Sequence, residues 1–153
     1  KKGSSHILRI IRELITFTPT SQGTNIDEAL RYFSNVVKKR CTAFLLSDFV
    51  GQQFSDALKI ASKKHDLSAI QIYDRREAQL EDIGLQWFVD AETGQTIQID
   101  TSSRNARESF ALWHRVENQR IQELFVKYGV DHVDIATGQD FVQPLIKLFR
   151  LRA

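Results

Sequence analysis

Two oxygen-bearing side chains, Thr24 and Asp48, are the best candidates in this sequence for holding a metal ion together. Asp48 follows a short apolar run at residues 41–46 (CTAFLL), and Thr24 precedes a helical pattern. If that helix packs antiparallel to the strand, both residues lie at the strand's carboxyl end, where open α/β sheets bind ligands. Hydroxyl and carboxylate oxygens suit Mg²⁺ or Mn²⁺, so the spacing predicts half of a metal site. A helix cap at Thr24, and a loop or cap role for Asp48, fully explain the same residues without a metal.

The elements that must position these residues alternate between helix and strand. Apolar residues at intervals of three and four predict helices, and short apolar runs predict strands. The first strand, almost continuously apolar, is expected to be buried on both faces of a parallel sheet. This alternation is typical of α/β architecture. The predicted helices cover residues 6–17, 25–39, 54–61, 105–128 and 141–149, and the predicted core strands cover 41–46, 67–73 and 130–136.

A hairpin interrupts the alternation between the second and third core strands. Residues 85–89 and 96–99 predict two short strands around the polar tip at residues 90–94. Trp87 and Phe88 are adjacent, so they point to opposite faces of the hairpin. One of them is either a candidate contact for a protein partner or is covered by a helix.

Composition excludes several classes of protein. The 153 residues correspond to one domain, and 21 basic residues interspersed with 19 acidic ones do not form the basic stripe of a nucleic-acid binder. No apolar run approaches the ~18 residues of a membrane span. The single cysteine, Cys41, fits a reducing compartment, and we expect a cytoplasmic protein. The absence of methionine predicts an N-terminally truncated chain, unless the initiator has been processed.

Enzyme chemistry is the main alternative. Cys41 is expected at the amino end of a strand, away from the predicted site, and no Cys-x-x-Cys or His-x-x-x-His pair suggests zinc. Asp48 at a strand end also fits a phosphoacceptor. However, the earlier acidic pair and the late lysine of receiver domains are not seen. An uncharacterised α/β enzyme or a phosphoacceptor domain using Asp48 therefore remains the alternative.

Several short motifs resemble a known family. Residues 23–30 (GTNIDEAL) resemble the threonine-bearing motif of von Willebrand factor A-like domains, and residues 44–49 (FLLSDF) resemble their aspartate-bearing strand. Over nearly the whole chain, the sequence is similar to the bacterial domain-of-unknown-function family fifty-eight. The motifs that carry this narrower similarity lie, in order, at residues 46–49, 64–66, 73–77, 90–94, 129–132 and 144–145.

The resemblance implies a single von Willebrand factor A-like domain over residues 1–153, a Rossmann-like α/β three-layer sandwich with an added β-hairpin. It also implies a metal-ion-dependent adhesion site in which Thr24 and Asp48 match two of three motifs. The third, Asp-x-Ser-x-Ser on a preceding strand, has no match here, so the domain is expected to be incomplete at its N-terminus. Members of the family are thought to be non-enzymatic adaptors for MoxR-type AAA+ ATPases in protein maturation.

The missing strand has two expected consequences. Strand 41–46 would have an unpaired edge, which favours a homodimer or a domain-swapped form. Mg²⁺ or Mn²⁺ would have at most two direct ligands, Thr24 and Asp48, so we expect metal to bind only in a longer protein that supplies the remaining oxygens.

Overall fold

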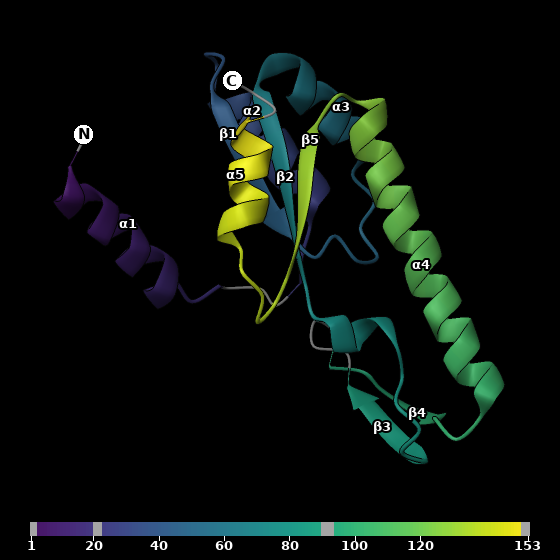
Figure 1. The fold of residues 1–153 in the computed structure, drawn as a ribbon. Coiled ribbons are helices and arrows are strands. Elements are labelled where there is room, and N and C mark those ends of the chain that lie inside the picture. Colours follow the sequence, from purple (N-terminus) through teal and green to yellow (C-terminus); the bar gives the residue numbers. More distant parts are fainter. Residues whose placement is uncertain (1–2, 20–22, 90–93, 151–153) are drawn as a thin grey trace.

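A three-stranded parallel sheet forms the central layer of the computed structural model, which describes residues 3–19, 23–89 and 94–150 (Figure 1). The strand order is β1-β2-β5, and a separate antiparallel hairpin consists of β3 and β4. The helices are α1 (Ser4–Thr16), α2 (Ile26–Val36), α3 (Ser55–Lys64), α4 (Arg104–Lys127) and α5 (Val142–Arg150), with a short 3-10 turn, η1 (Arg75–Ala78). The strands are β1 (Thr42–Ser47), β2 (Asp66–Tyr73), β3 (Leu85–Val89), β4 (Thr96–Asp100) and β5 (Asp131–Ala136).

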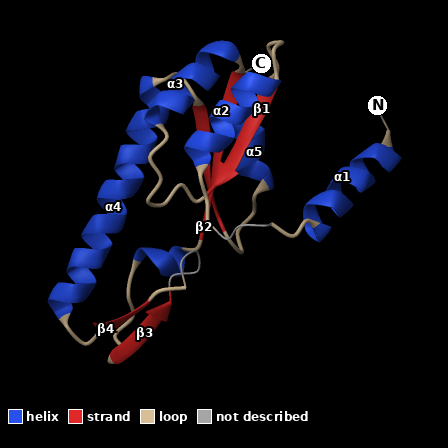
Figure 2. Ribbon diagram, turned by 180° about the vertical axis from the view of Figure 1, so that it is seen from behind, coloured by secondary structure: helices blue, strands red, loops and turns tan. Residues whose placement is uncertain are grey.

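Helices cover both faces of the sheet, as the predicted three-layer α/β class requires. In parallel strands, side chains in register share a face, and Leu45 lies beside Ala69, which lies beside His132. This face packs against α2, α3 and α4, whereas α5 crosses the opposite face (Figures 1 and 2). The main core lies on the three-helix side, with Leu30, Leu58, Ala61, Ala69, Ile121 and Phe125 among its buried members.

The amino half of α4 extends beyond the sheet and, with the hairpin, forms a projecting arm (Figure 1). Only the carboxyl half of the helix reaches the core, through Ile121 and Phe125. The helix ends as the sequence predicts. Gly129 adopts a left-handed conformation (φ 63°), and the Val130 N–H donates to the Phe125 carbonyl at 2.9 Å.

The prediction that the first strand is buried on both faces is wrong. Side chains of β1 alternate between exposed and half-buried, and Phe44 and Leu46 on the α5 side are 43% and 57% exposed. The reason is that β1 is the last strand on its side of the sheet, and α5 covers only part of its outer face, with Phe149 against Phe44.

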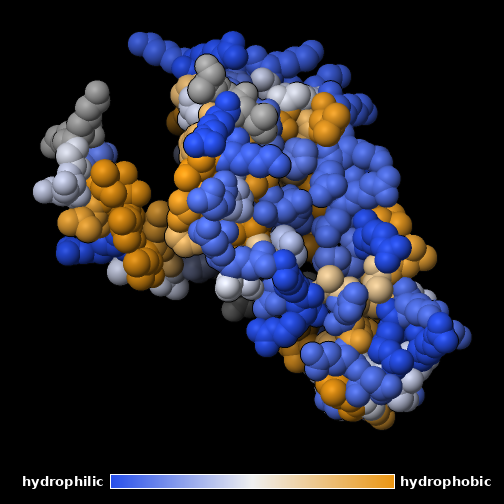
Figure 3. All heavy atoms as spheres, viewed as in Figure 1, coloured by the Kyte–Doolittle hydropathy of each residue, from blue (hydrophilic) through white to orange (hydrophobic). Residues whose placement is uncertain are grey.

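Helix α1 carries the predicted apolar face but buries none of it. The helix stands clear of the sheet, and its apolar side chains form an orange surface in Figure 3. The exposed residues of this face include Ile7, Ile11, Leu14 and Ile15. No helix among the described residues is long and apolar enough to cross a membrane.

Candidate functional site

The residues predicted to bind metal belong to segments that meet at one edge of the sheet. The connection at residues 37–41 leads from the end of α2 to the amino end of β1, so α2 runs antiparallel to the strand. The start of α2, preceded by Thr24, therefore lies toward the carboxyl end of β1, where Asp48 follows (Figures 1 and 2). We call this edge the rim.

Thr24 is not needed to cap α2. Asn25 is the cap, and its side-chain oxygen accepts a hydrogen bond from the Glu28 N–H at 3.0 Å. Its amide also donates to the Glu28 carboxylate at 3.3 Å. Because Asn25 takes this role, Thr24 is left exposed at the rim, and its hydroxyl is available for another contact.

Asp48 lies in a tight turn that presents its carboxylate to solvent. One carboxylate oxygen accepts hydrogen bonds from the Val50 N–H (3.3 Å) and the Ser47 hydroxyl (3.4 Å). The next residue, Phe49, has a φ of 62°, which costs an L residue on the order of 1 kcal/mol or more. Its ring is fully buried beside Phe54 and Phe125, and this burial holds the strained backbone in place.

Two polar contacts tie the turn to α4. The buried Gln71 amide donates to the Asp48 carbonyl and to Asn118 Oδ1, both at 3.0 Å. Arg120 donates to the Gln52 carbonyl at 2.9 Å and pairs with Glu117. These residues were not among the predicted site residues, although a glutamine within the apolar strand LSAIQIY is a visible signal. The rim is therefore fixed from β2 and from α4 together.

Glu117 and Arg120 stabilise each other's charged form. The hydrogen bond from Arg120 is the main reason that the pKa of Glu117 lies below its ordinary value, and the charge of Arg120 and the Gly51 N–H contribute. The hydrogen bond with Glu117 in turn raises the pKa of Arg120. Both groups are thus ionised at neutral pH, and Glu117 orients the guanidinium toward the loop.

The rim residues supply only some of the ligands that a metal site needs. Thr24 and Asp48 supply one hydroxyl and one carboxylate, whereas Mg²⁺ takes six oxygen ligands in octahedral geometry. Within the part of the chain that the structure describes, no group of three or more His, Cys, Asp or Glu side chains could hold a metal ion. The metal site at Thr24 and Asp48 therefore stays a prediction.

Cys41 has a neighbouring base that the sequence analysis did not foresee. Its sulfur lies 3.6 Å from His65 Nδ1, at the amino end of β1 and opposite the rim. Burial, with a smaller effect of Lys64, lowers the pKa of His65. A buried imidazole that resists protonation is a poor acceptor for the thiol proton, so this pair gives no support to a nucleophilic Cys41.

The hairpin presents apolar side chains to solvent. Leu85, Trp87 and Val89 share one face of β3 and are 60%, 66% and 63% exposed, and orange surface also appears at this end of the molecule in Figure 3. Phe88 is half-buried on the other face, as expected from its position beside Trp87. We refer to Leu85, Trp87 and Val89 as the hairpin row.

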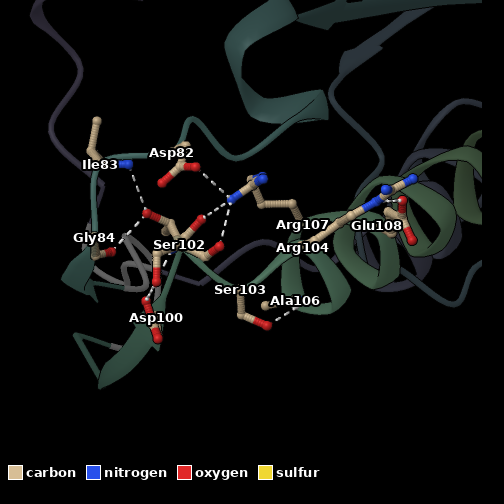
Figure 4. Close-up of polar contacts among 11 residues, drawn as sticks. Asp82, Ile83, Gly84, Asp100, Ser102, Ser103, Arg104, Ala106, Arg107 and Glu108 are labelled. Atoms are coloured by element: carbon tan, nitrogen blue, oxygen red, sulfur yellow. Dashed lines mark hydrogen bonds and ion pairs between the residues drawn. The ribbon is translucent and has the colours of Figure 1, made fainter.

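The base of the hairpin is fixed to the start of α4 (Figure 4). Arg107 pairs with Asp82 at 3.1 Å and donates to the carbonyls of Thr101 and Ser102. The fully buried Thr101 hydroxyl donates to the Gly84 carbonyl at 2.7 Å and accepts from a backbone N–H. These contacts hold the hairpin row in a defined position relative to α4.

The ion pair between Glu117 and Arg120 predicts that the stability of the fold depends on pH. Because the folded-state pKa is below the unfolded value, Glu117 stabilises the fold above the unfolded pKa, and this contribution is lost as pH falls through the folded pKa. We expect Glu117→Gln to lower the free energy of unfolding by about 1–3 kcal/mol at pH 7. Urea titrations should show a smaller difference at pH 3. A difference independent of pH would contradict this role, and Glu108→Gln serves as an exposed control.

Comparison with known proteins identifies relatives without an assigned activity. An uncharacterized protein of Mycobacterium avium is 26% identical over 116 residues, covering 75% of this chain and 68% of the relative. Uncharacterized proteins of Mycobacterium bovis and Mycobacterium tuberculosis are each 23% identical over 157 residues and 99% of this chain. The chain spans only 49% of the length of these last two relatives.

One solved structure also resembles the chain. The conserved hypothetical protein BatB from Bacteroides thetaiotaomicron matches 96% of this chain and 71% of its own, with 15% identity and a TM-score of 0.49. The family model described as "Protein of unknown function DUF58" matches residues 1–120. This match confirms the resemblance that the sequence motifs indicated, and the chain belongs to the DUF58 family.

Proposed function

We propose that this chain is a non-enzymatic protein-interaction module that uses its hairpin row to contact a partner. The observation that supports this proposal best is the exposure of Leu85, Trp87 and Val89, which lie on a hairpin whose base is fixed by Arg107. A two-stranded hairpin has little stability of its own, and burying these side chains against a partner would remove apolar surface from water. Exposed tryptophans are frequent energetic centres of protein interfaces.

The rim supplies a second, metal-dependent contact in this proposal. Thr24 and Asp48 contribute two oxygens to Mg²⁺ or Mn²⁺, and further oxygens come from outside the described residues. A carboxylate of the partner completes the coordination shell. The family resemblance suggests a MoxR-type AAA+ ATPase as the partner, with this chain acting as its adaptor in protein maturation.

Trp87→Ala tests the hairpin contact. If Trp87 is an interface centre, its truncation should weaken binding to a purified MoxR-type ATPase from the same source by about 2 kcal/mol. Biolayer interferometry measures this change. Tyr32→Ala removes an exposed aromatic side chain from α2, elsewhere on the surface, and should leave the affinity unchanged. Equal affinity of wild type and Trp87→Ala would contradict the proposal.

Asp48→Ala tests the rim. The variant should lose the same metal-dependent part of the affinity that EDTA removes from the wild-type protein. Thermal stability should change by less than about 1 kcal/mol, because the carboxylate is exposed. Glu123→Ala, an exposed carboxylate change on α4, is the matched control. Partner binding that is indifferent to EDTA would remove the metal from the proposal, and hydroxylamine-labile phosphate on Asp48 would favour the phosphoacceptor alternative.

The outer edge of β1 is a further contact surface, and we propose that it pairs with a second copy. Antiparallel pairing of two β1 strands would place Lys39 and Arg40 of one copy near Asp48 of the other, so opposite charges meet at both ends. The main chain of an unpaired edge strand offers hydrogen bonds to such a partner. The exposed Phe44 and Leu46 would lose solvent contact at the same time.

Leu46→Lys tests this pairing, because an edge lysine opposes strand addition. Light scattering should show a wild-type dimer at high concentration and a monomeric variant. Ile60→Lys on α3 exchanges an apolar residue of similar exposure and should leave the dimer intact. A wild-type monomer at all concentrations would exclude a homodimer through this edge.

A further inference from the structure

A polar cleft separates α4 from the carboxyl halves of β2 and β5, away from the hairpin row. Its volume is about 570 Å³, within the range of small-molecule sites. Side chains from three elements line it, together with residues at the end of η1. The chemically important lining residues are Gln71, Tyr73, His114, Arg115, Asn118 and Asp134.

Two acceptor groups of this cleft, the Asp134 carboxylate and Asn118 Oδ1, already have protein donors. The Gln122 amide donates to the Asp134 carboxylate at 3.0 Å and satisfies one of its acceptor positions, although the carboxylate keeps its charge. Gln71 donates to Asn118 Oδ1, and the Asn118 amide lies 3.3 Å from His114 Nδ1. With Nδ1 accepting from Asn118, a neutral His114 carries its proton on Nε2.

Three other donor groups of the cleft, by contrast, lack protein partners within the described ranges. Arg115 forms no ion pair with any residue in the described ranges, although six other arginines do. The Tyr73 hydroxyl has no hydrogen bond within the same ranges, and His114 Nε2 is likewise unmatched there. The cleft thus combines one cation that lacks an ion pair with two further donors, which suits an anionic group on the Arg115 side, away from the Asp134 carboxylate.

We propose that this cleft binds a small organic molecule carrying a phosphate or carboxylate group. The anionic group lies against Arg115, with Tyr73 and His114 donating to its oxygens. The remaining volume accommodates the rest of the molecule among the amide side chains. This site differs from the rim and from the hairpin row, so its existence does not depend on the proposed partner.

Gln71 connects the cleft to the rim. Its buried amide joins Asn118, at the wall of the cleft, to the carbonyl of Asp48. A ligand that moves Asn118 therefore changes the environment of the Asp48 turn. This connection provides a readout at residues 48–51, which do not line the cleft.

Titration of the ¹⁵N-labelled protein with inorganic phosphate and, separately, with citrate tests the proposal. We expect saturable shifts at cleft amides, with smaller shifts at residues 48–51, for at least one anion. The anion that saturates distinguishes phosphate from carboxylate ligands. Arg115→Gln should weaken binding about tenfold, as the loss of a charge-assisted hydrogen bond predicts. Tyr73→Phe should weaken it less while keeping the ring.

Arg12→Gln on α1 is the matched control, because it removes the same charge from an exposed helix. It should leave the affinity for either anion unchanged. Equal weakening by Arg12→Gln and Arg115→Gln would overturn the proposal, because it would indicate nonspecific attraction. Shifts that do not saturate, or that fall outside the cleft for both anions, would overturn it as well. Neither result bears on partner binding through Trp87, so the two proposals fail separately.

Discussion

Burial of the Phe49 ring is the interaction on which the rim depends. The ring packs against Phe54 and Phe125, with centroids 5.7 and 5.1 Å away, and joins the turn after β1 to the start of α3 and to α4. A positive φ at this residue is unfavourable by itself, so the turn keeps its shape because apolar burial outweighs the backbone cost. The exposed Asp48 carboxylate gains a fixed direction from the buried side chain that follows it.

Polar contacts add to the aromatic packing in fixing the conformation of the turn after β1. The buried Gln71 amide donates a hydrogen bond to the Asp48 carbonyl, and an unpaired amide at this place would cost free energy. Arg120 fixes the following segment by donating to the Gln52 carbonyl. Both contacts also involve α4, directly or through Asn118. The long helix therefore borders three features at once: the rim, the polar cleft and the base of the hairpin.

Two kinds of surface follow from this arrangement. On the three-helix side, a continuous core buries the inner faces of α2 and α3 and of the carboxyl half of α4. The outer edge of β1, the apolar face of α1 and the hairpin row bury little, and all three present large apolar side chains to solvent. Exposed apolar surface concentrated on separate elements is typical of contact sites. This distribution is the basis of the interaction role that we propose.

The sequence by itself determined the order of helices and strands, the hairpin strands at residues 85–89 and 96–99, and the placement of Thr24 and Asp48 before α2 and after β1. These features follow from local periodicity, turn residues and the antiparallel path of a helix that returns to a parallel strand. Tertiary structure alone decided that β1 is half exposed and that Gln71 meets Asn118 across 47 residues. Burial of a strand depends on what covers it, and a contact between distant side chains depends on how α4 is rotated against the sheet. Neither property is encoded in the spacing of neighbouring residues.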